Sequence, residues 1–255
     1  MLGGGALIAG GVGYSIHSNL LEVTQHHLSG VLPGSGGLKI AVVADLHAPR
    51  TLVSLDALAE RVNEADCDAL FIVGDTIDRS GNEVLVKEIF KALRVRGPKL
   101  AVLGNWEYWG GVDLRKLSKA YEAAGVQLLR NETVVVDFKD GKVTVVGLDD
   151  LISGQPEFDL VSAEEFQIIL AHCPGSFDRI RALADHPCLM ISGHTHGGQI
   201  SPFGLVLWLP PGSGGYSRGW YHVGNHKLFV SRSLGNSVIP FRLGSRPELA
   251  IIELS

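Results

Sequence analysis

The chain lacks the features that mark several common protein classes. It has only 3 cysteines among 255 residues, an odd number without a Cys-x-x-Cys pair, so no disulfide framework is expected. Its formal net charge of −5 gives no basic excess, which argues against a general nucleic-acid binder. The length and a hydrophobic content of 45% favour one large α/β domain rather than two small ones.

Acidic residues are absent from residue 186 to residue 247. The basic residues in that span are Arg218, Lys227, Arg232, Arg242 and Arg246. A region with charge of one sign attracts an anionic substrate or an anionic membrane surface, although arginine stems that pack in the fold would give the same composition. Arg232 and Arg242 are therefore candidate substrate-binding residues.

The first residues differ in character from the rest. Leu2 to Ile16 is apolar or Gly-rich, and no charge occurs before Glu22. This stretch is too short for a free-standing membrane span, which needs about 20 residues, and no basic region precedes it as in a secretory signal. A remnant of an anchor or export signal, a short interfacial segment and a packed Gly-rich arm remain as interpretations, and we favour the first. We therefore divide the chain into an N-terminal segment, 1–38, and a single domain, 39–255.

Three predicted strands in the first half each end in a polar residue. Continuous apolar runs at 40–44, 69–73 and 99–103 predict strands buried on both faces. An apolar stripe over 52–65 predicts a helix, and the capping-box spacing of Ser80 and Glu83 predicts a second helix to about Leu93. The strands are followed by Asp45-x-His47, Gly74-Asp75 and Gly104-Asn105. Because carboxyl ends of such strands form the ligand-binding rim of open α/β sheets, we expect these polar groups to converge there.

The second half repeats this arrangement with imidazoles. Predicted strands at 166–171 and 188–192 end in His172 and in Gly193-His194-Thr195-His196. Asp140-Gly141 indicates a hairpin between 133–138 and 142–148, and 227–231 and 249–254 are further predicted strands. Three histidines at two strand ends, flanked by glycine, indicate a metal site rather than isolated core residues.

These blocks, from Lys39 to Gln199, resemble in order and spacing those of the calcineurin-like metallophosphoesterases. The tail from Ser231 to Glu248 is similar to that of the membrane-associated bacterial branch of the family. The resemblance implies an α/β fold, a β-sandwich of mixed sheets flanked by helices and built from βαβ units, with two divalent metal ions. It implies that Asp45, His47 and His196 hold one ion, that Asn105, His172 and His194 hold the other, and that Asp75 bridges them.

The residue chemistry is compatible with this implied site. Two neighbouring cations polarise a phosphoryl oxygen and activate water for attack at neutral pH. Ligands of nitrogen and oxygen without thiolate suit Mn, Fe, Zn or Co, and the sequence does not distinguish among them. Asp78, Arg79 and Glu107 are candidates for catalytic or supporting roles beside the ligands.

One position departs from the resembled pattern. The block that usually contains Gly-Asn-His has Trp106 at the position of the histidine, which is thought to protonate the leaving group. Indole does not donate a proton at neutral pH as imidazole does, so this role does not carry over. Glu107, His222 and His226 are possible substitutes. Trp106, Tyr108 and Trp109 are candidates for the wall of the substrate site.

The leading hypothesis is a dinuclear-metal hydrolase of phosphodiester or pyrophosphate bonds, with a lipid-linked or membrane-associated substrate. A UDP-diacylglucosamine-type pyrophosphatase of lipid A synthesis is a narrower alternative, and a non-catalytic metal-binding scaffold is an alternative of another class. The apolar segment 203–211, closed by two prolines, is either a core strand or a loop that touches acyl chains or the bilayer. We expect membrane association in a bacterium, peripheral or N-terminally anchored, with the side of the membrane open.

Overall fold

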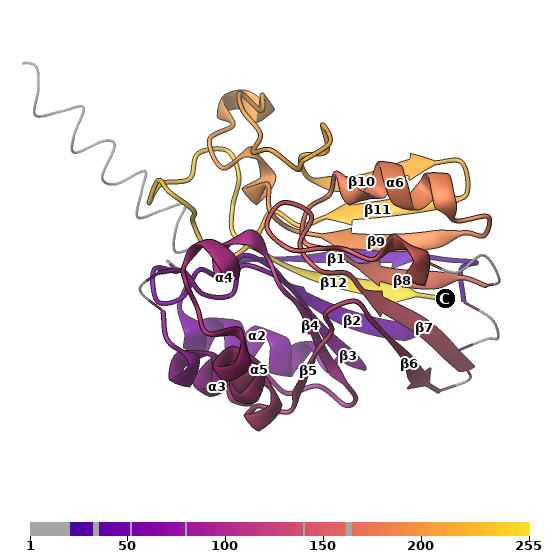
Figure 1. The fold of residues 1–255 in the computed structure, drawn as a ribbon, viewed down its shortest axis with the longest axis horizontal. Helices are drawn as coiled ribbons and strands as arrows, with labels where there is room; N and C mark the ends of the chain where they lie inside the picture. Colours follow the sequence, from indigo (N-terminus) through magenta and orange to yellow (C-terminus); the bar gives the residue numbers. More distant parts are fainter. Residues whose placement is uncertain (1–20, 33–35, 52, 80, 140, 162–164) are drawn as a thin grey trace, which may run out of the picture.

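Two mixed six-stranded sheets pack face to face in the computed structural model, which describes residues 21–32, 36–51, 53–79, 81–139, 141–161 and 165–255 (Figure 1). The first sheet contains, in spatial order, β1 (Glu22–Leu28), β12 (Glu248–Leu254), β2 (Leu38–Val43), β3 (Ala69–Val73), β4 (Lys99–Val102) and β5 (Val126–Leu128). The second contains β10 (Gly219–Val223), β11 (His226–Val230), β9 (Cys188–Ser192), β8 (Gln167–Leu170), β7 (Gly141–Gly147) and β6 (Glu132–Phe138). The predicted α/β sandwich of mixed sheets is confirmed.

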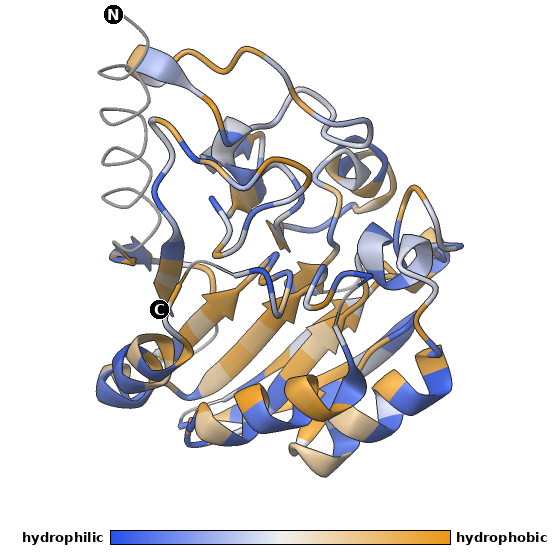
Figure 2. Cartoon of the chain, turned by 90° about the vertical axis from the view of Figure 1, so that its left-hand side faces the viewer, coloured by the Kyte–Doolittle hydropathy of each residue, from blue (hydrophilic) through white to orange (hydrophobic). Residues whose placement is uncertain are grey.

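The helices and single turns either cover the outer faces of the two sheets or follow strand ends at the edge of the sandwich (Figure 1). They are α2 (Leu55–Ala65), α3 (Glu83–Ala92), α4 (Asn105–Trp109), α5 (Leu114–Ala123) and α6 (Ser176–Leu183), with single turns η1 (Phe158–Leu160), η2 (His196–Gly198) and η3 (Pro202–Gly204). Helices α2, α3 and α5 pack on the first sheet and α6 on the second (Figure 1). Figure 2 shows mainly hydrophobic strands beside helices whose outer faces are hydrophilic.

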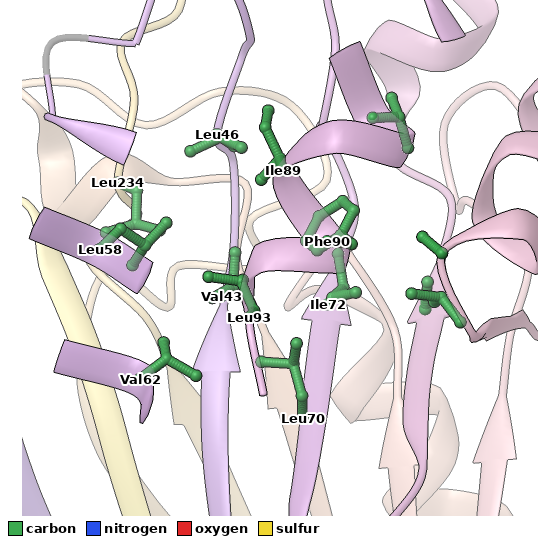
Figure 3. Close-up of a cluster of buried hydrophobic side chains, with 14 of the residues drawn as sticks. Val43, Leu46, Leu58, Val62, Leu70, Ile72, Ile89, Phe90, Leu93 and Leu234 are labelled. Carbon is green, nitrogen blue, oxygen red and sulfur yellow. The ribbon is translucent and has the colours of Figure 1, made fainter. Parts of the chain in front are cut away.

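The continuous apolar runs arise because the central strands are buried on both faces. In β3, Phe71 and Val73 belong to the core between the two sheets, whereas Leu70 and Ile72 face the helices. Figure 3 shows Leu70 and Ile72 beside Phe90 of α3. A strand whose side chains point alternately into two cores has no polar face. Polar side chains can therefore follow it only where the strand ends.

The strand directions determine where those ends lie. Strands β2, β3, β4 and β5 run parallel to one another in the first sheet, and β7, β8, β9 and β11 run parallel in the second. Groups that follow β2, β3 and β4 lie against groups that follow β8 and β9. The carboxyl ends of both sheets therefore share one edge of the sandwich.

Two predicted boundaries need correction. Residues 22–28, assigned from sequence to the N-terminal segment, form β1, which pairs with β12 along its whole length, so the folded part begins before Lys39. The pattern was missed because an edge strand alternates between half-buried and exposed residues instead of forming an apolar run. Helix α3 begins at Glu83 with Asn82 as its cap rather than Ser80, because the Asn82 side chain accepts a hydrogen bond from Leu85 N.

The rest of the N-terminal prediction concerns residues 1–20, which lie outside the described residues. Within the described ranges, no helix combines the length and the apolar character needed to cross a membrane.

Candidate functional site

Seven polar side chains from five strand ends meet at the shared edge. They follow β2, β3, β4, β8 and β9, and each is at most 6% exposed. They are the residues predicted from sequence, namely Asp45, His47, Asp75, Asn105, His172, His194 and His196. Their assignment as metal ligands stays a prediction, but the structure brings all of them together.

The backbone holds most of these residues in an unfavourable conformation. Five of them have φ between 49° and 72°, in the left-handed region, and these are Asp45, His47, Asp75, His194 and His196. For residues other than glycine this conformation costs about 1–3 kcal/mol each, and it clusters at functional sites. Hydrogen bonds from Asp45 N to Gly74 O (3.1 Å) and from His47 N to Asp75 O (3.0 Å) hold the two turns together.

Two glycines are required because carboxylates lie directly against them. A Cβ atom on Gly104 would be 2.3 Å from Asp75 Oδ1, and one on Gly193 would be 2.3 Å from Asp45 Oδ2. Both distances are far below van der Waals contact. The glycines that precede Asn105 and His194 therefore allow the two sheets to bring their carboxylates and imidazoles into one cluster.

The first group of donors contains Asp45, His47 and His196, whose ligating atoms lie within 4.8 Å of one another. His47 Nε2 is 3.3 Å from His196 Nε2, and His196 Nε2 is 3.6 Å from Asp45 Oδ1. Asp75 Oδ2 is also near this group, 3.7 Å from His47 Nε2. These distances suit donors that share one small cation.

The second group surrounds His172. Its Nε2 atom is 3.2 Å from Asn105 Oδ1, 3.2 Å from His194 Nδ1 and 3.2 Å from Asp75 Oδ2. Asp75 is therefore within reach of both groups, as a bridging residue must be. Its carboxylate also accepts a hydrogen bond from Trp106 N at Oδ1 (2.8 Å).

The tautomers of three imidazoles provide a test of whether a cation fits. His172 Nδ1 lies 3.0 Å from Val73 O, His194 Nε2 lies 2.7 Å from Pro211 O, and His196 Nδ1 lies 3.1 Å from Gly235 O. A carbonyl only accepts, so each of these nitrogens donates, and in the neutral ring the opposite nitrogen carries a lone pair. These lone pairs face carboxylate, amide and imidazole acceptors, so acceptor atoms lie against acceptor atoms. A divalent cation placed between them would satisfy all of these groups.

The electrostatic environment keeps most of the rings in their ligating form. Burial lowers the pKa of His47 to about 4 and lowers the pKa of both His194 and His196. Burial raises the pKa of Asp75, but the adjacent His172 outweighs burial and holds that pKa well below its usual range. Burial lowers the pKa of His172, but the carboxylates of Asp75 and Asp45 outweigh burial and raise that pKa well above its ordinary value, and burial raises the pKa of Asp45 itself. Without a cation, His172 and Asp45 therefore tend to keep a proton that a bound metal would replace. Neutral imidazoles and an ionised carboxylate are the forms in which these side chains bind metal.

Glu107 links the turns that carry the second group. Its fully buried carboxylate accepts hydrogen bonds from the backbone N–H groups of Asp75 (3.1 Å), Thr76 (2.7 Å), Ile77 (3.4 Å) and Gly104 (2.8 Å). Burial and the nearby Asp75 raise the pKa of Glu107 to about 8. Since its contacts are to backbone and it does not line the cavity described below, its geometry is that of a positioning residue.

The other two predicted supporting residues do not line the cavity, although the charge of the Asp78 carboxylate acts on the predicted ligand His47 and opposes the effect of burial on its pKa. Asp78 is buried, and its Oδ2 atom is 3.1 Å from Arg50 Nε, whereas Arg79 is exposed. Their predicted role beside the ligands stays a prediction.

A cavity of about 480 Å³ opens from the ligand cluster. Asp75, Asn105, His194 and His196 form its polar floor. Most of the remaining lining side chains are apolar, and they are Trp106, Trp109, Ile152, Ile200, Leu207, Trp208, Pro210, Pro211, Val238 and Ile239. The site therefore combines an anion-binding floor, once cations are bound, with an apolar wall.

The aromatic residues of α4 divide between two environments. Trp106 and Trp109 line the cavity, and the Trp106 ring meets His47 edge-on with ring centroids 5.7 Å apart. Tyr108 does not, because its hydroxyl donates to the Asp149 carboxylate and its ring lies 5.8 Å from the Arg130 guanidinium carbon. Residues three apart lie on the same side of a helix, which explains why Trp106 and Trp109 both line the cavity whereas Tyr108 points elsewhere. The prediction that Tyr108 walls the site is therefore wrong.

The two arginines predicted to bind substrate are also placed elsewhere. Arg232 pairs with Glu22 (3.0 Å) and Glu248 (2.9 Å), and neither it nor Arg242 lines the cavity. Arg242 is 1% exposed and donates to Gly235 O (2.6 Å), the carbonyl that also accepts from His196. The acid-free span misled the prediction because the acidic partners of Arg232 lie outside that span. Arg242 instead fixes the carbonyl that orients His196.

The sequence did not indicate that Ser233 contacts a predicted ligand, and it left open whether the segment 203–211 is a strand or a loop. Ser233 Oγ donates to Asp45 Oδ2 over 2.6 Å, and Ser233 itself has a φ of 68°. It lies in the tail noted for its family resemblance, the only available signal. The segment 203–211 contains no core strand and is a loop after η3, with Leu207 and Trp208 each 69% exposed.

Comparisons with known proteins agree with this geometry. Residues 38–198 match the family model described as calcineurin-like phosphoesterase. Uncharacterized metallophosphoesterase YkuE of Bacillus subtilis (strain 168) is 32% identical, over 99% of this chain and 93% of its own length. Phosphodiesterase YaeI of Escherichia coli (strain K12) is 30% identical, over 91% of this chain and 88% of its own length. A solved structure, TT1561 of Thermus thermophilus, gives a TM-score of 0.49 at 12% identity, over 77% of this chain and 90% of that chain, which is too distant to bear on the chemistry.

Proposed function

The chain belongs to the calcineurin-like phosphoesterase family and is a metal-dependent phosphoesterase, and from this premise we propose that it cleaves phosphodiester or pyrophosphate bonds in a lipid-linked or membrane-associated substrate. The observation that carries the proposal is the direct continuity between the ligand cluster and an apolar cavity of about 480 Å³. A phosphoryl group at the floor would leave the rest of the substrate against tryptophan, leucine, isoleucine and proline side chains. Such a wall favours acyl or prenyl chains over a second polar group.

The proposal includes two divalent ions. Asp45, His47 and His196 would hold one, Asn105, His172 and His194 the other, and Asp75 would contact both. When bound, the cations supply Lewis-acid activation of the phosphoryl group and of the attacking water. The chain's own residues hold the neutral imidazoles in place through the carbonyls of Val73, Pro211 and Gly235.

Exposed apolar side chains in the wall of the cavity and in the chain segment that leads into it support contact with a membrane surface. Phe203, Leu205, Leu207, Trp208 and Val238 are each at least 65% exposed. A cluster of such residues on a globular domain is typical of an interaction surface.

The first strand, β1, begins at the edge of the fold that carries the ligand cluster. Glu22 N, at the start of β1, donates to Pro247 O (2.9 Å), and the Glu22 carboxylate pairs with Arg232. Arg232 is two residues before Leu234, and the N–H of Leu234 donates to Ala44 O at the end of β2. Glu22 is therefore near the carboxyl end of β2. The uncharged N-terminal sequence therefore joins the domain at the edge that carries the site. We propose that this edge faces the bilayer.

The decisive experiment measures bound metal and turnover together. Purified protein is loaded with Mn²⁺, Fe²⁺, Zn²⁺ or Co²⁺, and hydrolysis of a nitrophenyl phosphodiester is compared with hydrolysis of lipid-linked and lipid-free pyrophosphates that share one head group. We expect two ions per chain and a lower KM for the lipid-linked compound. Stoichiometric metal without turnover of any substrate would instead support a non-catalytic scaffold, and equal KM values would contradict the lipid-binding role of the wall.

A further inference from the structure

The cavity contains few groups that could donate a proton to a leaving group. Among the described residues that line it, the titratable ones are Asp75, His194 and His196. All three belong to the ligand cluster. None of the described lining residues is Lys, Arg, Tyr, Cys or Glu.

Each of the two imidazoles that line the cavity uses its N–H group in a hydrogen bond to a backbone carbonyl. His194 Nε2 donates to Pro211 O and His196 Nδ1 donates to Gly235 O, so the opposite nitrogens of both rings face the ligand cluster as lone pairs. An imidazole held in this way has no proton to give to a substrate oxygen. Asp75 accepts from Trp106 N and lies against His172, so it is held as an acceptor.

The residues that could replace a proton donor do not reach the cavity. Glu107 is 0% exposed and uses its carboxylate to bind backbone N–H groups. His226 begins β11, which runs parallel to β9, whereas the ligand His194 follows the end of β9. His226 and its hairpin neighbour His222 therefore lie toward the opposite end of the second sheet.

Trp106 occupies the position beside the cluster where a donor would be useful. Its ring meets His47 edge-on, it lines the cavity, and its backbone N–H binds Asp75. The indole N–H is a hydrogen-bond donor but does not release a proton at neutral pH. The residue therefore closes the floor of the cavity without supplying acid catalysis.

We propose that the leaving group departs from this site as an unprotonated anion, so that the enzyme cleaves phosphoanhydride bonds of lipid-linked pyrophosphates rather than alkyl phosphoesters. The inference rests on the proposed function and narrows its substrate class. In the step, a water oxygen bonds to phosphorus while the bond from phosphorus to the leaving oxygen breaks. The leaving oxygen keeps the electron pair, and the protons of water end on the product phosphate and in solvent. A phosphate ester is a weak enough base to leave in this way, whereas an alkoxide is not.

The test is the dependence of kcat/KM on leaving-group pKa for a series of methyl aryl phosphodiesters, from nitrophenol to unsubstituted phenol. We expect a steep decrease with rising leaving-group pKa in the wild type and in Trp106→Phe, which keeps an apolar wall. Trp106→His should flatten the slope, with a gain of about 10²–10⁴-fold for the phenyl ester and little gain for the nitrophenyl ester. Tyr108→His is the matched control, because it adds an imidazole to the same helix at a position that does not line the cavity, and it should keep the steep slope.

A second measurement needs no variant. Substitution of ¹⁸O at the leaving oxygen of the nitrophenyl diester should give a large normal isotope effect in the wild type, because the bond breaks without compensating protonation. A shallow wild-type slope together with an isotope effect near unity would overturn the inference while leaving the phosphoesterase activity intact. Absence of turnover for the whole series with every metal would instead overturn the proposed function, and the inference with it.

Discussion

The floor and the wall of the cavity are built in opposite ways. The floor is the part of the ligand cluster that faces the cavity, and five of the seven buried residues of that cluster have a left-handed backbone. The wall is contributed largely by loop residues such as Leu207, Trp208 and Val238, which are apolar and mostly exposed. Rigid sheets thus position the reactive groups, whereas loops surround the remainder of the substrate. In a scaffold of this kind, loop changes alter specificity without rebuilding the chemistry.

The residues of the floor should act as one unit. Asp75 lies within reach of both ligand groups, so Asp75→Asn should lower kcat/KM by about 10³-fold or more and remove most of the bound metal. Asn105→Ala is the companion variant, because the Asn105 side chain lies 3.2 Å from His172 Nε2 in the second group, so its loss should mainly empty one site. Metal analysis and phosphodiester kinetics on both variants test this. Wild-type metal content and turnover in Asp75→Asn would refute the bridging assignment.

The wall can be tested separately from the floor. Leu207→Asp combined with Trp208→Asp should weaken binding to anionic vesicles by about 10²-fold, since each large apolar side chain contributes about 1.5–3 kcal/mol when it leaves water. Vesicle flotation measures this loss directly. The matched control is Val135→Asp on β6, which is 54% exposed and does not line the cavity.

Two outcomes would contradict the assigned role of the wall. Unchanged flotation of the double variant would mean that these side chains do not contact the bilayer. An equal loss in the Val135→Asp control would mean that added negative charge, rather than the position of the apolar side chains, causes the effect.

The floor could be predicted from sequence because its residues follow a rule that is local in the chain. An apolar run followed by glycine and a ligand-type residue identifies the end of a buried strand, as in Val73-Gly74-Asp75 and Leu103-Gly104-Asn105. Parallel pairing then brings those ends together. The central strands and the hairpin were predicted for the same reason.

The surroundings of the floor could not be predicted because they depend on contacts between distant segments. Arg232 and Arg242 belong to the acid-free span, but the acidic partners of Arg232 are Glu22 and Glu248, and Arg242 is buried behind His196. The orientation of Tyr108 depends on Asp149, 41 residues later. Composition indicates charge, but it does not identify which charges are neutralised in the fold.

The smallest predicted effect concerns Glu107, which supports the floor without contacting the cavity. Glu107→Gln keeps the size of the side chain but replaces one of its two acceptor oxygens with an N–H₂ donor. Oε1 accepts from Thr76 and Ile77, and Oε2 from Asp75 and Gly104, so either orientation of the amide places a donor against backbone N–H groups. The expected loss of metal affinity is about 10-fold, within the range found when groups that orient metal ligands are removed.

The readout that separates positioning from direct catalysis is the metal dependence of the rate. If Glu107 only positions Asp75 and Asn105, excess metal should restore most of the kcat of Glu107→Gln, because the reacting groups are unchanged and only their occupancy falls. Titration of activity against metal concentration for wild type and variant measures this. If Glu107 instead transferred a proton during the reaction, kcat would stay low at saturating metal and its pH profile would change, since an amide cannot titrate. The four backbone hydrogen bonds favour the first outcome, because they occupy both carboxylate oxygens away from the cavity.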